Sequence, residues 1–159
     1  MDQPDEQDSI EFRPACADDV PALVALERAN MQSLVETHYP GTWSDLRAAK
    51  TIQENLQRTT VAVRKGRLLG FYCWQTDKEH GAGLHSIQVA ASKQGRGFGT
   101  QMMNSFEKEV SEQGIGSIVL AVHDGNPARR LYERRGYRVI DSDGPHAWLL
   151  RKDLENAGR

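Results

Sequence analysis

Cysteine is scarce in this sequence, and long apolar runs are missing. Cys16 and Cys73 are the only cysteines in 159 residues. They are too few for a disulfide framework, and neither lies in a Cys/His spacing typical of zinc sites. No apolar run approaches the roughly 18 residues of a membrane span, and the N-terminus lacks the basic-then-apolar order of a signal peptide. We therefore expect a protein without a bound metal, in a reducing cytoplasm.

An excess of one charge is also lacking. The formal net charge is −2 and 26% of the residues are charged, so we expect no nucleic-acid partner and no membrane partner. A length of 159 residues suits one domain with its own core. The first eight residues contain four acids, which predicts a disordered acidic tail over 1–8. A single domain over 9–154 and a C-terminal tail over 155–159 complete the expected organisation.

The apolar periodicity predicts an α/β protein with strands and helices interspersed. Strands are predicted over residues 9–14, 60–64, 68–76, 84–91, 117–122, 137–140 and 147–151. Helical spacing is predicted from residue 20, in a second helical run at 31–35, and over 44–57, 100–113 and 126–134. A hairpin turn is expected at 65–67 and a polar loop at 77–83.

A glycine-rich turn follows the strand predicted over 84–91. It reads Gln94-Gly95-Arg96-Gly97-Phe98-Gly99-Thr100. Backbone N–H groups at a helix start lack an intrahelical partner, the helix dipole makes that end positive, and glycines let the backbone close on a ligand. The turn is therefore predicted to bind an anion, most naturally a phosphate, with Lys93 and Arg96 adding positive charge. Neither Gly-x-x-x-x-Gly-Lys-Ser/Thr nor Gly-x-Gly-x-x-Gly can be read in it.

Two segments together resemble the GNAT superfamily of N-acetyltransferases. Gln94-x-x-Gly97-x-Gly99 resembles its acetyl-CoA pyrophosphate loop. Ala128-x-x-Leu131-Tyr132-x-x-x-Gly136-Tyr137, preceded by Asn126, resembles its second motif. The resemblance is specific over roughly residues 84–138. It implies the GNAT fold, which is a mostly antiparallel sheet of six to seven strands with about four helices, in which the parallel fourth and fifth strands splay to hold acetyl-CoA.

The resemblance also implies a ligand and an activity. The residues that it places against acetyl-CoA are Ile87, Gln88, Val89, Gln94, Gly95, Arg96, Gly97, Phe98, Gly99, Thr100, Asn126, Arg129 and Tyr132. The implied reaction is acetyl transfer to a primary amine, which we expect to belong to a small molecule. The alternatives are a protein or peptide amine, or a non-catalytic acyl-CoA-binding regulatory module, because a fold does not fix a function. The resemblance also allows a homodimer.

Tyr132 is the predicted general acid, because the family's second-motif tyrosine points its hydroxyl at the CoA sulfur. A phenol of ordinary pKa ~10 keeps its proton at neutral pH and can give it to a thiolate of pKa ~8.5. A plain core tyrosine is the alternative. The oxyanion is expected to meet a backbone N–H near Val89. The arginines nearby are expected to form one basic patch, with one or two near CoA and the rest solvated: Arg129, Arg130, Arg134, Arg135 and Arg138.

His85 is the predicted general base. It falls where arylalkylamine N-acetyltransferases carry a strand histidine, and its ordinary pKa of ~6.5 suits a base near neutral pH. It shares strand parity with Ile87 and Val89, so it alternatively fills a half-buried face. Rival bases are Glu27, Glu36, His38 and a water relay. The residues expected to contact the acceptor are Glu27, Glu36, His38, Tyr39 and Trp43, although the two aromatics alternatively form a lid on the core.

Overall fold

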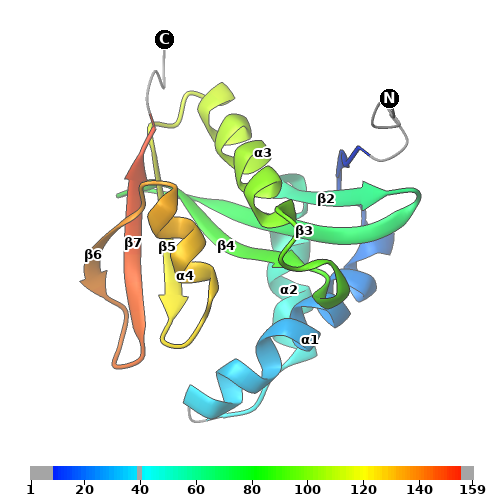
Figure 1. Ribbon diagram of the computed structural model, residues 1–159, viewed down its shortest axis with the longest axis horizontal. Helices are drawn as coiled ribbons and strands as arrows, with labels where there is room; N and C mark the ends of the chain where they lie inside the picture. The colour runs from blue at the N-terminus through cyan, green and yellow to red at the C-terminus, as the bar shows by residue number, and fades with distance from the viewer. Residues whose placement is uncertain (1–8, 39–40, 155–159) are drawn as a thin grey trace.

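The computed structural model describes residues 9–38 and 41–154. Their centre is one seven-stranded sheet in the order β1-β2-β3-β4-β5-β7-β6. The strands are β1 (Glu11–Pro14), β2 (Thr59–Arg64), β3 (Arg67–Asp77), β4 (Gly81–Val89), β5 (Ser117–His123), β6 (Arg138–Ser142) and β7 (Ala147–Asp153). The helices are α1 (Val20–His38), α2 (Asp45–Glu54), α3 (Phe98–Glu112) and α4 (Ala128–Arg134). The predicted mixed α/β architecture is confirmed (Figure 1).

The sheet is antiparallel except where β4 meets β5. That parallel pairing covers Ala82 with Ile118, Gly83 with Val119 and Leu84 with Leu120. Beyond this point β4 runs on to Val89 and β5 to His123 without pairing to each other in the described chain. The two strands therefore separate, as the resemblance predicted, and their inner edges border an opening in the sheet.

Helices cover both faces of the sheet. Phe106 and Val110 of α3 pack with Tyr72 and Trp74 of β3 in the larger apolar cluster, to which α4 adds Tyr132. A second cluster joins α1 and α2 to the other face, through side chains that include Leu23, Ile52, Phe71 and Cys73. Figure 1 shows α3 and α4 in front of the sheet and α2 behind it. Because β3 presents alternate side chains to opposite faces, one strand anchors both layers.

Local chemistry explains several boundaries. Ser44 caps α2, because its hydroxyl accepts from the backbone N–H of Arg47 at 3.1 Å. The β2–β3 hairpin turns at Lys65 and Gly66, whose φ values of 52° and 73° are typical of a type I′ turn. Gly97, at φ 82°, precedes α3, so the helix begins at Phe98 rather than at the predicted Thr100. α1 is one continuous helix rather than two runs, and β4 begins at Gly81, inside the loop predicted over 77–83.

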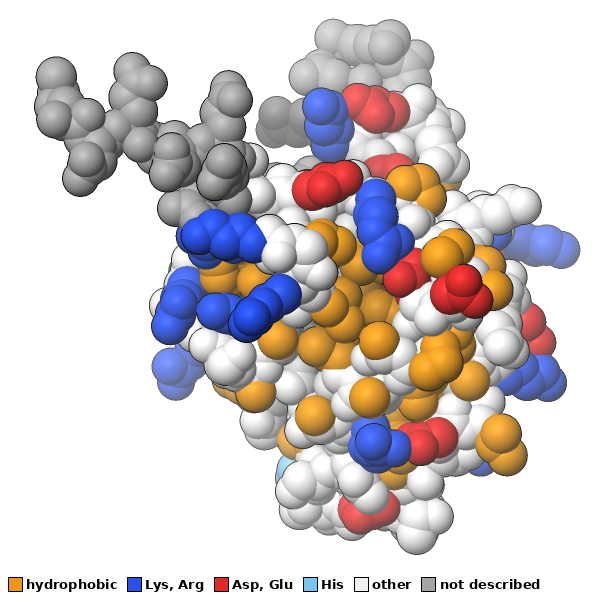
Figure 2. All heavy atoms as spheres, turned by 90° about the vertical axis from the view of Figure 1, so that its right-hand side faces the viewer, with side chains coloured by type: hydrophobic (Ala, Val, Ile, Leu, Met, Phe, Trp, Pro, Cys, Tyr) orange, Lys and Arg blue, Asp and Glu red, His pale blue; other side chains and the backbone are white. Residues whose placement is uncertain are grey.

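Charges of both signs share the face shown in Figure 2, where they are interspersed with apolar side chains. This mixture fits the small net charge of −2. No helix among the described residues is both long and apolar enough to cross a membrane. The predicted tails at 1–8 and 155–159, and Tyr39 of the predicted acceptor loop, lie outside the described residues.

Candidate functional site

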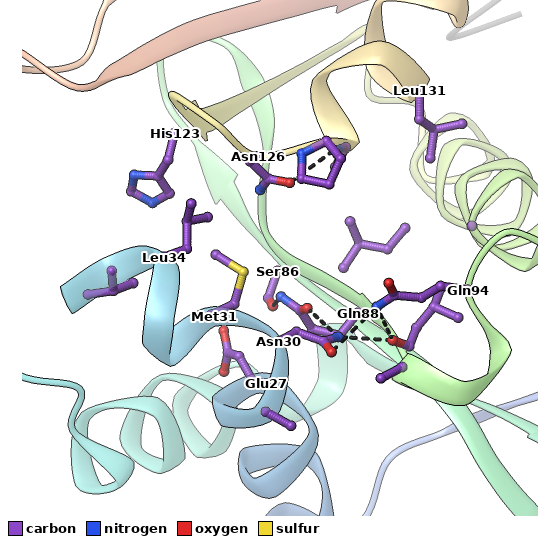
Figure 3. Close-up of a pocket in the computed structure, with 18 of the residues that line it drawn as sticks. Glu27, Asn30, Met31, Leu34, Ser86, Gln88, Gln94, His123, Asn126 and Leu131 are labelled. Atoms are coloured by element: carbon purple, nitrogen blue, oxygen red, sulfur yellow. Dashed lines mark hydrogen bonds between the residues drawn. The ribbon is translucent and has the colours of Figure 1, made fainter. Parts of the chain in front are cut away.

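A cleft of about 920 Å³ opens where β4 and β5 separate. Its walls come from the second half of α1, from β4 and β5, from the glycine turn and from the start of α4 (Figure 3). Most of the predicted acetyl-CoA residues lie along it: Ile87, Gln88, Val89, Gln94, Gly95, Phe98, Gly99, Asn126 and Tyr132. Residues from both resembling segments, far apart in sequence, thus face one cavity.

The glycine turn has the geometry of an anion cradle. Gly95 and Gly97 have φ values of 78° and 82°, which side chains rarely tolerate, and a Cβ on either would point into open space. The first turn of α3 follows at once, with its backbone N–H groups free of helical partners. Lys93 lines the cleft beside the turn. These features fit the phosphates of a CoA ligand. Arg96, Gly97 and Thr100 flank the cleft without lining it.

Tyr132 and Asn126 lie where β5 leads into α4. Tyr132 is buried, lines the cleft and packs edge-on against Tyr137, with ring centroids 5.9 Å apart. Burial raises its pKa above that of a free phenol, so it stays protonated at neutral pH. The Asn126 side-chain oxygen accepts from the backbone N–H of Ala128 at 2.9 Å while the residue also lines the cleft. Asn126 is therefore both a helix cap and a cleft residue, the two roles considered from its sequence.

His85 occupies a β-bulge. The register pairs Cys73 with Ser86 and Trp74 with Leu84, so one step along β3 matches two along β4, and His85 is the extra residue. Bulges redirect side chains and are common beside functional sites. His85 keeps the strand parity with Ile87 and Val89 that the sequence indicated, since none of the three is buried while Leu84, Ser86 and Gln88 are. The His85 side chain is solvent-accessible inside the cleft, whose walls desolvate it and lower its pKa.

Two of the five arginines predicted to form a basic patch are paired with acids. Arg129 is bonded to Glu133 at 2.8 Å, stacks over Trp148 and does not line the cleft. Arg135 is largely buried and pairs with Glu107 at 3.1 Å. Sequence spacing could show the Arg129–Glu133 pair, which is four residues apart on one helix, but not the Arg135–Glu107 pair, because Glu107 lies on a different helix.

Among the described residues that were predicted to contact the acceptor, three line the cleft and one does not. Glu27, His38 and Trp43 line the cleft. Glu36 does not: its carboxylate accepts from the backbone N–H of Trp43 at 3.0 Å and so holds the loop that follows α1. The cleft also includes residues that the sequence did not single out: Asn30, Met31, Leu34, Ser86 and His123. A usable signal was the spacing of Glu27, Met31 and Leu34, which places the three residues on one face of a helix.

A chain of hydrogen bonds links the glycine turn to α1 and β4. The Gln94 side-chain amide donates to the Asn30 oxygen at 3.4 Å, and the Asn30 amide donates to the Gln88 oxygen at 3.0 Å. The Gln88 amide then donates to the Ser86 hydroxyl at 3.0 Å. Asn30 and Gln94 also donate to the backbone oxygen of Val89. The dashed lines in Figure 3 follow this chain, which fixes the last residues of β4 against α1.

The comparisons with known proteins agree with this geometry. The acetyltransferase (GNAT) family matches residues 28–137. The [ribosomal protein bS18]-alanine N-acetyltransferase of Haemophilus influenzae is 30% identical over 79 residues, which are 50% of this chain and 53% of that protein. The chain thus matches about half the length of this curated relative.

Solved structures show the same fold. The PaiA N-acetyltransferase from Thermoplasma acidophilum, in complex with coenzyme A, superposes with a TM-score of 0.72 at 20% identity, covering 92% of this chain and 99% of its own. The ribosomal-protein-S18-alanine N-acetyltransferase from Escherichia coli gives 0.71 at 20% identity, covering 93% and 98%. The family match spans well over half of the sequence and includes the glycine turn and the segment from Asn126 to Tyr137. The chain therefore belongs to the acetyltransferase (GNAT) family.

Proposed function

We propose that this protein transfers the acetyl group of acetyl-CoA to a primary amine, most simply that of a small molecule. The observation that supports this best is the single cleft on which the glycine turn, the open edge of β4, Asn126 and Tyr132 all lie. The glycine turn offers backbone N–H groups to the phosphates. The open edge of β4 offers backbone groups to an extended ligand and to an oxyanion near Val89. Tyr132 provides a proton donor deep in the same cleft.

Acetyl transfer to nitrogen needs a neutral amine, a stabilised oxyanion and a proton for the departing thiolate. Tyr132 is protonated at neutral pH and buried, so it suits the last of these roles. Its raised pKa makes it a weaker acid than a free phenol. The same desolvation raises the proton affinity of a thiolate formed beside it, so proton transfer between the two groups is not penalised overall.

A protein or peptide amine is the second candidate acceptor. It is favoured by the relative from Haemophilus influenzae, whose name states an alanine of a ribosomal protein as its substrate. The second half of α1 lines the cleft with exposed residues, among them Ala29, Ser33 and Thr37, which leaves a peptide end a route to the site.

The test begins with calorimetric titration of acetyl-CoA into the protein. Release of free thiol is then followed against a panel of small amines, amino acids and peptides with free N-termini. Binding together with turnover of one amine class supports the proposal and names the acceptor. Tight binding without turnover of any amine would favour the regulatory module, and the absence of binding would refute the assignment of the glycine turn.

A further inference from the structure

One carboxyl group in the cleft has an unusual environment. Glu27 is only 8% exposed, and its Oε2 atom is buried without a hydrogen-bond partner among the described residues. Burying an ionised carboxylate with an unsatisfied oxygen is costly, so such a group calls for an explanation. Glu27 nevertheless borders the cleft rather than the closed core. Figure 3 shows it projecting from α1 toward Ser86 on β4, below Met31.

The hydrogen-bond chain from the glycine turn ends at Ser86, next to this carboxyl group. Each amide in the chain donates in one direction, from Gln94 through Asn30 and Gln88 to the Ser86 hydroxyl. Because Ser86 accepts from Gln88, its own proton is available to Glu27, and this neighbouring hydroxyl lowers the pKa of Glu27 against the effect of burial. Aligned donors polarise one another. The chain therefore fixes the Ser86 hydroxyl beside Glu27, while no described residue donates to Oε2.

The other neighbours of Glu27 do not neutralise it. From β3 the titratable group is Cys73, whose buried thiol has its pKa raised to about 11 and is therefore uncharged. From β4, beyond Ser86, the titratable group is His85 in the cleft, with a lowered pKa. The α2 helix contributes apolar Ala48 and Ile52 to the cluster on this side. Burial raises the pKa of Glu27, and the neighbouring Ser86 hydroxyl opposes this rise only in part. The carboxyl group therefore binds a proton more tightly than a free glutamate does.

The cleft also carries opposite charges on two of its walls. Among the described residues that line it, Glu27 is the only acid and Lys93 the only Lys or Arg. Lys93 lies at the glycine turn, where phosphates are expected, and Glu27 lies on α1. Met31 and Leu34 continue the Glu27 face of α1 at helical spacing and line the cleft beside it. This arrangement complements a cationic amine with an apolar substituent.

We infer that Glu27 binds the acceptor ammonium through its carboxylate and takes its proton, acting as the general base in place of His85. This inference rests on the proposed acetyl transfer. The ammonium gives one proton to the carboxylate. The nitrogen lone pair then forms the C–N bond to the acetyl carbon as the C–S bond breaks. The thiolate takes a proton from Tyr132, the second nitrogen proton restores Tyr132 through water, and Glu27 releases its proton to solvent, so each turnover yields one proton.

The pH dependence of Glu27→Gln tests this assignment. An alkyl ammonium has a pKa near ~10, so wild-type kcat/KM is expected to be nearly flat between pH 7 and 9, because Glu27 can accept the proton from the abundant ammonium. The Gln variant can use only amine that is already unprotonated. Its kcat/KM is therefore expected to rise about tenfold per pH unit, and at pH 7 it should be on the order of 10²–10³-fold lower than that of the wild type. Glu27→Asp should recover part of the flat profile.

The probes are phenethylamine, as a small amine, and a peptide with a free N-terminal alanine, so the two acceptor sources are measured separately. The slope over pH 7 to 9 is read with phenethylamine, because the α-amino group of the peptide has a pKa near ~8 and its slope ends there. His85→Gln is the competing-base variant and is expected to keep the flat profile. Glu54→Gln, an exposed acid on α2, is the control and should match the wild type. A Glu27→Gln enzyme with a flat profile, or a His85→Gln enzyme with the tenfold slope, would overturn the inference. Failure of the wild type to acetylate either probe would instead overturn the proposed function for these acceptors.

Discussion

At the scale of single residues, Tyr132 gives the most direct test of the chemistry. Tyr132→Phe keeps the buried ring and its packing on Tyr137 but removes the only proton that the side chain can give. We expect kcat to fall roughly 10–10³-fold, around the range of general acid catalysis, while calorimetry shows little change in acetyl-CoA affinity.

The neighbouring ring supplies the matched control for that variant. Tyr137→Phe removes a hydroxyl that donates to Glu107 at 3.2 Å, outside the cleft. It should lower stability slightly and leave kcat close to the wild-type value. An unchanged kcat in Tyr132→Phe would remove Tyr132 from the mechanism.

The buried carboxyl group of Glu27 also leads to a prediction about stability. Its folded-state pKa is raised above the ordinary value, so the folded protein holds this proton more tightly than the unfolded chain does. The proton on Glu27 therefore contributes fully to the free energy of unfolding at low pH, and this contribution is lost as the pH rises through the folded-state pKa. Glu27→Gln should be more stable than the wild type at pH 7, by about 1–3 kcal/mol.

Denaturant unfolding at several pH values checks this sign. The advantage of the Gln variant should shrink toward zero as the pH is lowered to 4, where the wild-type carboxyl group is protonated too. An advantage that does not depend on pH would mean that packing, and not the buried charge, distinguishes the two side chains. A gain in stability together with a loss of activity is the pattern of a functional group maintained at the expense of the fold.

At the scale of elements, the glycine turn and α3 form the predicted phosphate site. Gly97→Glu places a bulky negative side chain where phosphates are expected, so acetyl-CoA binding should be abolished in a calorimetric titration. Gly114→Glu is the matched control, because Gly114 also has positive φ, at 77°, but follows the other end of α3. It strains the backbone similarly and should bind acetyl-CoA normally. Binding by the Gly97 variant would refute the turn as the phosphate site.

The second half of α1 is predicted to recognise the acceptor's substituent. Met31→Ala and Leu34→Ala each remove apolar surface from the cleft wall, so KM for an apolar amine should rise roughly three- to tenfold, the effect of losing one or two methylene contacts. The acetyl-CoA affinity should not change. Gln32→Ala, exposed and outside the cleft, is the control for α1. A change in acetyl-CoA affinity without a change in KM would place these side chains on the donor side.

The same elements show what the sequence could predict. The glycine turn, the cap at Asn126 and the buried face of α3 depend on nearby residues, so local spacing was sufficient for them. The bulge at His85 depends on how β4 pairs with β3, and the carboxyl environment of Glu27 depends on Ser86, which is far away in sequence. Such long-range registers leave no local pattern. Glu27 could be proposed as a rival base from sequence, but its burial and its unpaired oxygen could not.

At the scale of the whole molecule, the two sides of the cleft are braced behind the site. Glu107 of α3 accepts from Lys152 of β7 at 2.7 Å, from the Tyr137 hydroxyl at 3.2 Å and from Arg135 at 3.1 Å. Tyr137 in turn supports the ring of Tyr132. One carboxylate therefore ties the α3 layer to the segment that follows α4 and to β7, across the opening between β4 and β5, where the sheet itself contributes few hydrogen bonds.

This brace leads to a prediction for global stability. Glu107 is nearly buried, and although burial alone would raise its pKa, the bonds from Arg135 and Lys152 prevail and lower it. Its contribution is thus present above the ordinary pKa and is lost as pH falls through the lower folded value. Glu107→Gln leaves two cationic groups poorly compensated and should cost about 3–5 kcal/mol at pH 7. The exposed control Glu112→Gln should cost less than about 0.5 kcal/mol.

Denaturant unfolding at pH 7 and at pH 3 distinguishes the brace from ordinary packing. The gap between the wild type and Glu107→Gln should narrow at pH 3, because acid begins to protonate the wild-type carboxylate. The cause differs from that at Glu27. The carboxylate of Glu107 stabilises the fold through its partners, whereas the carboxylate of Glu27 lowers stability because its Oε2 atom has no partner among the described residues. A gap that stays constant with pH would show that the two acids do not differ in this way.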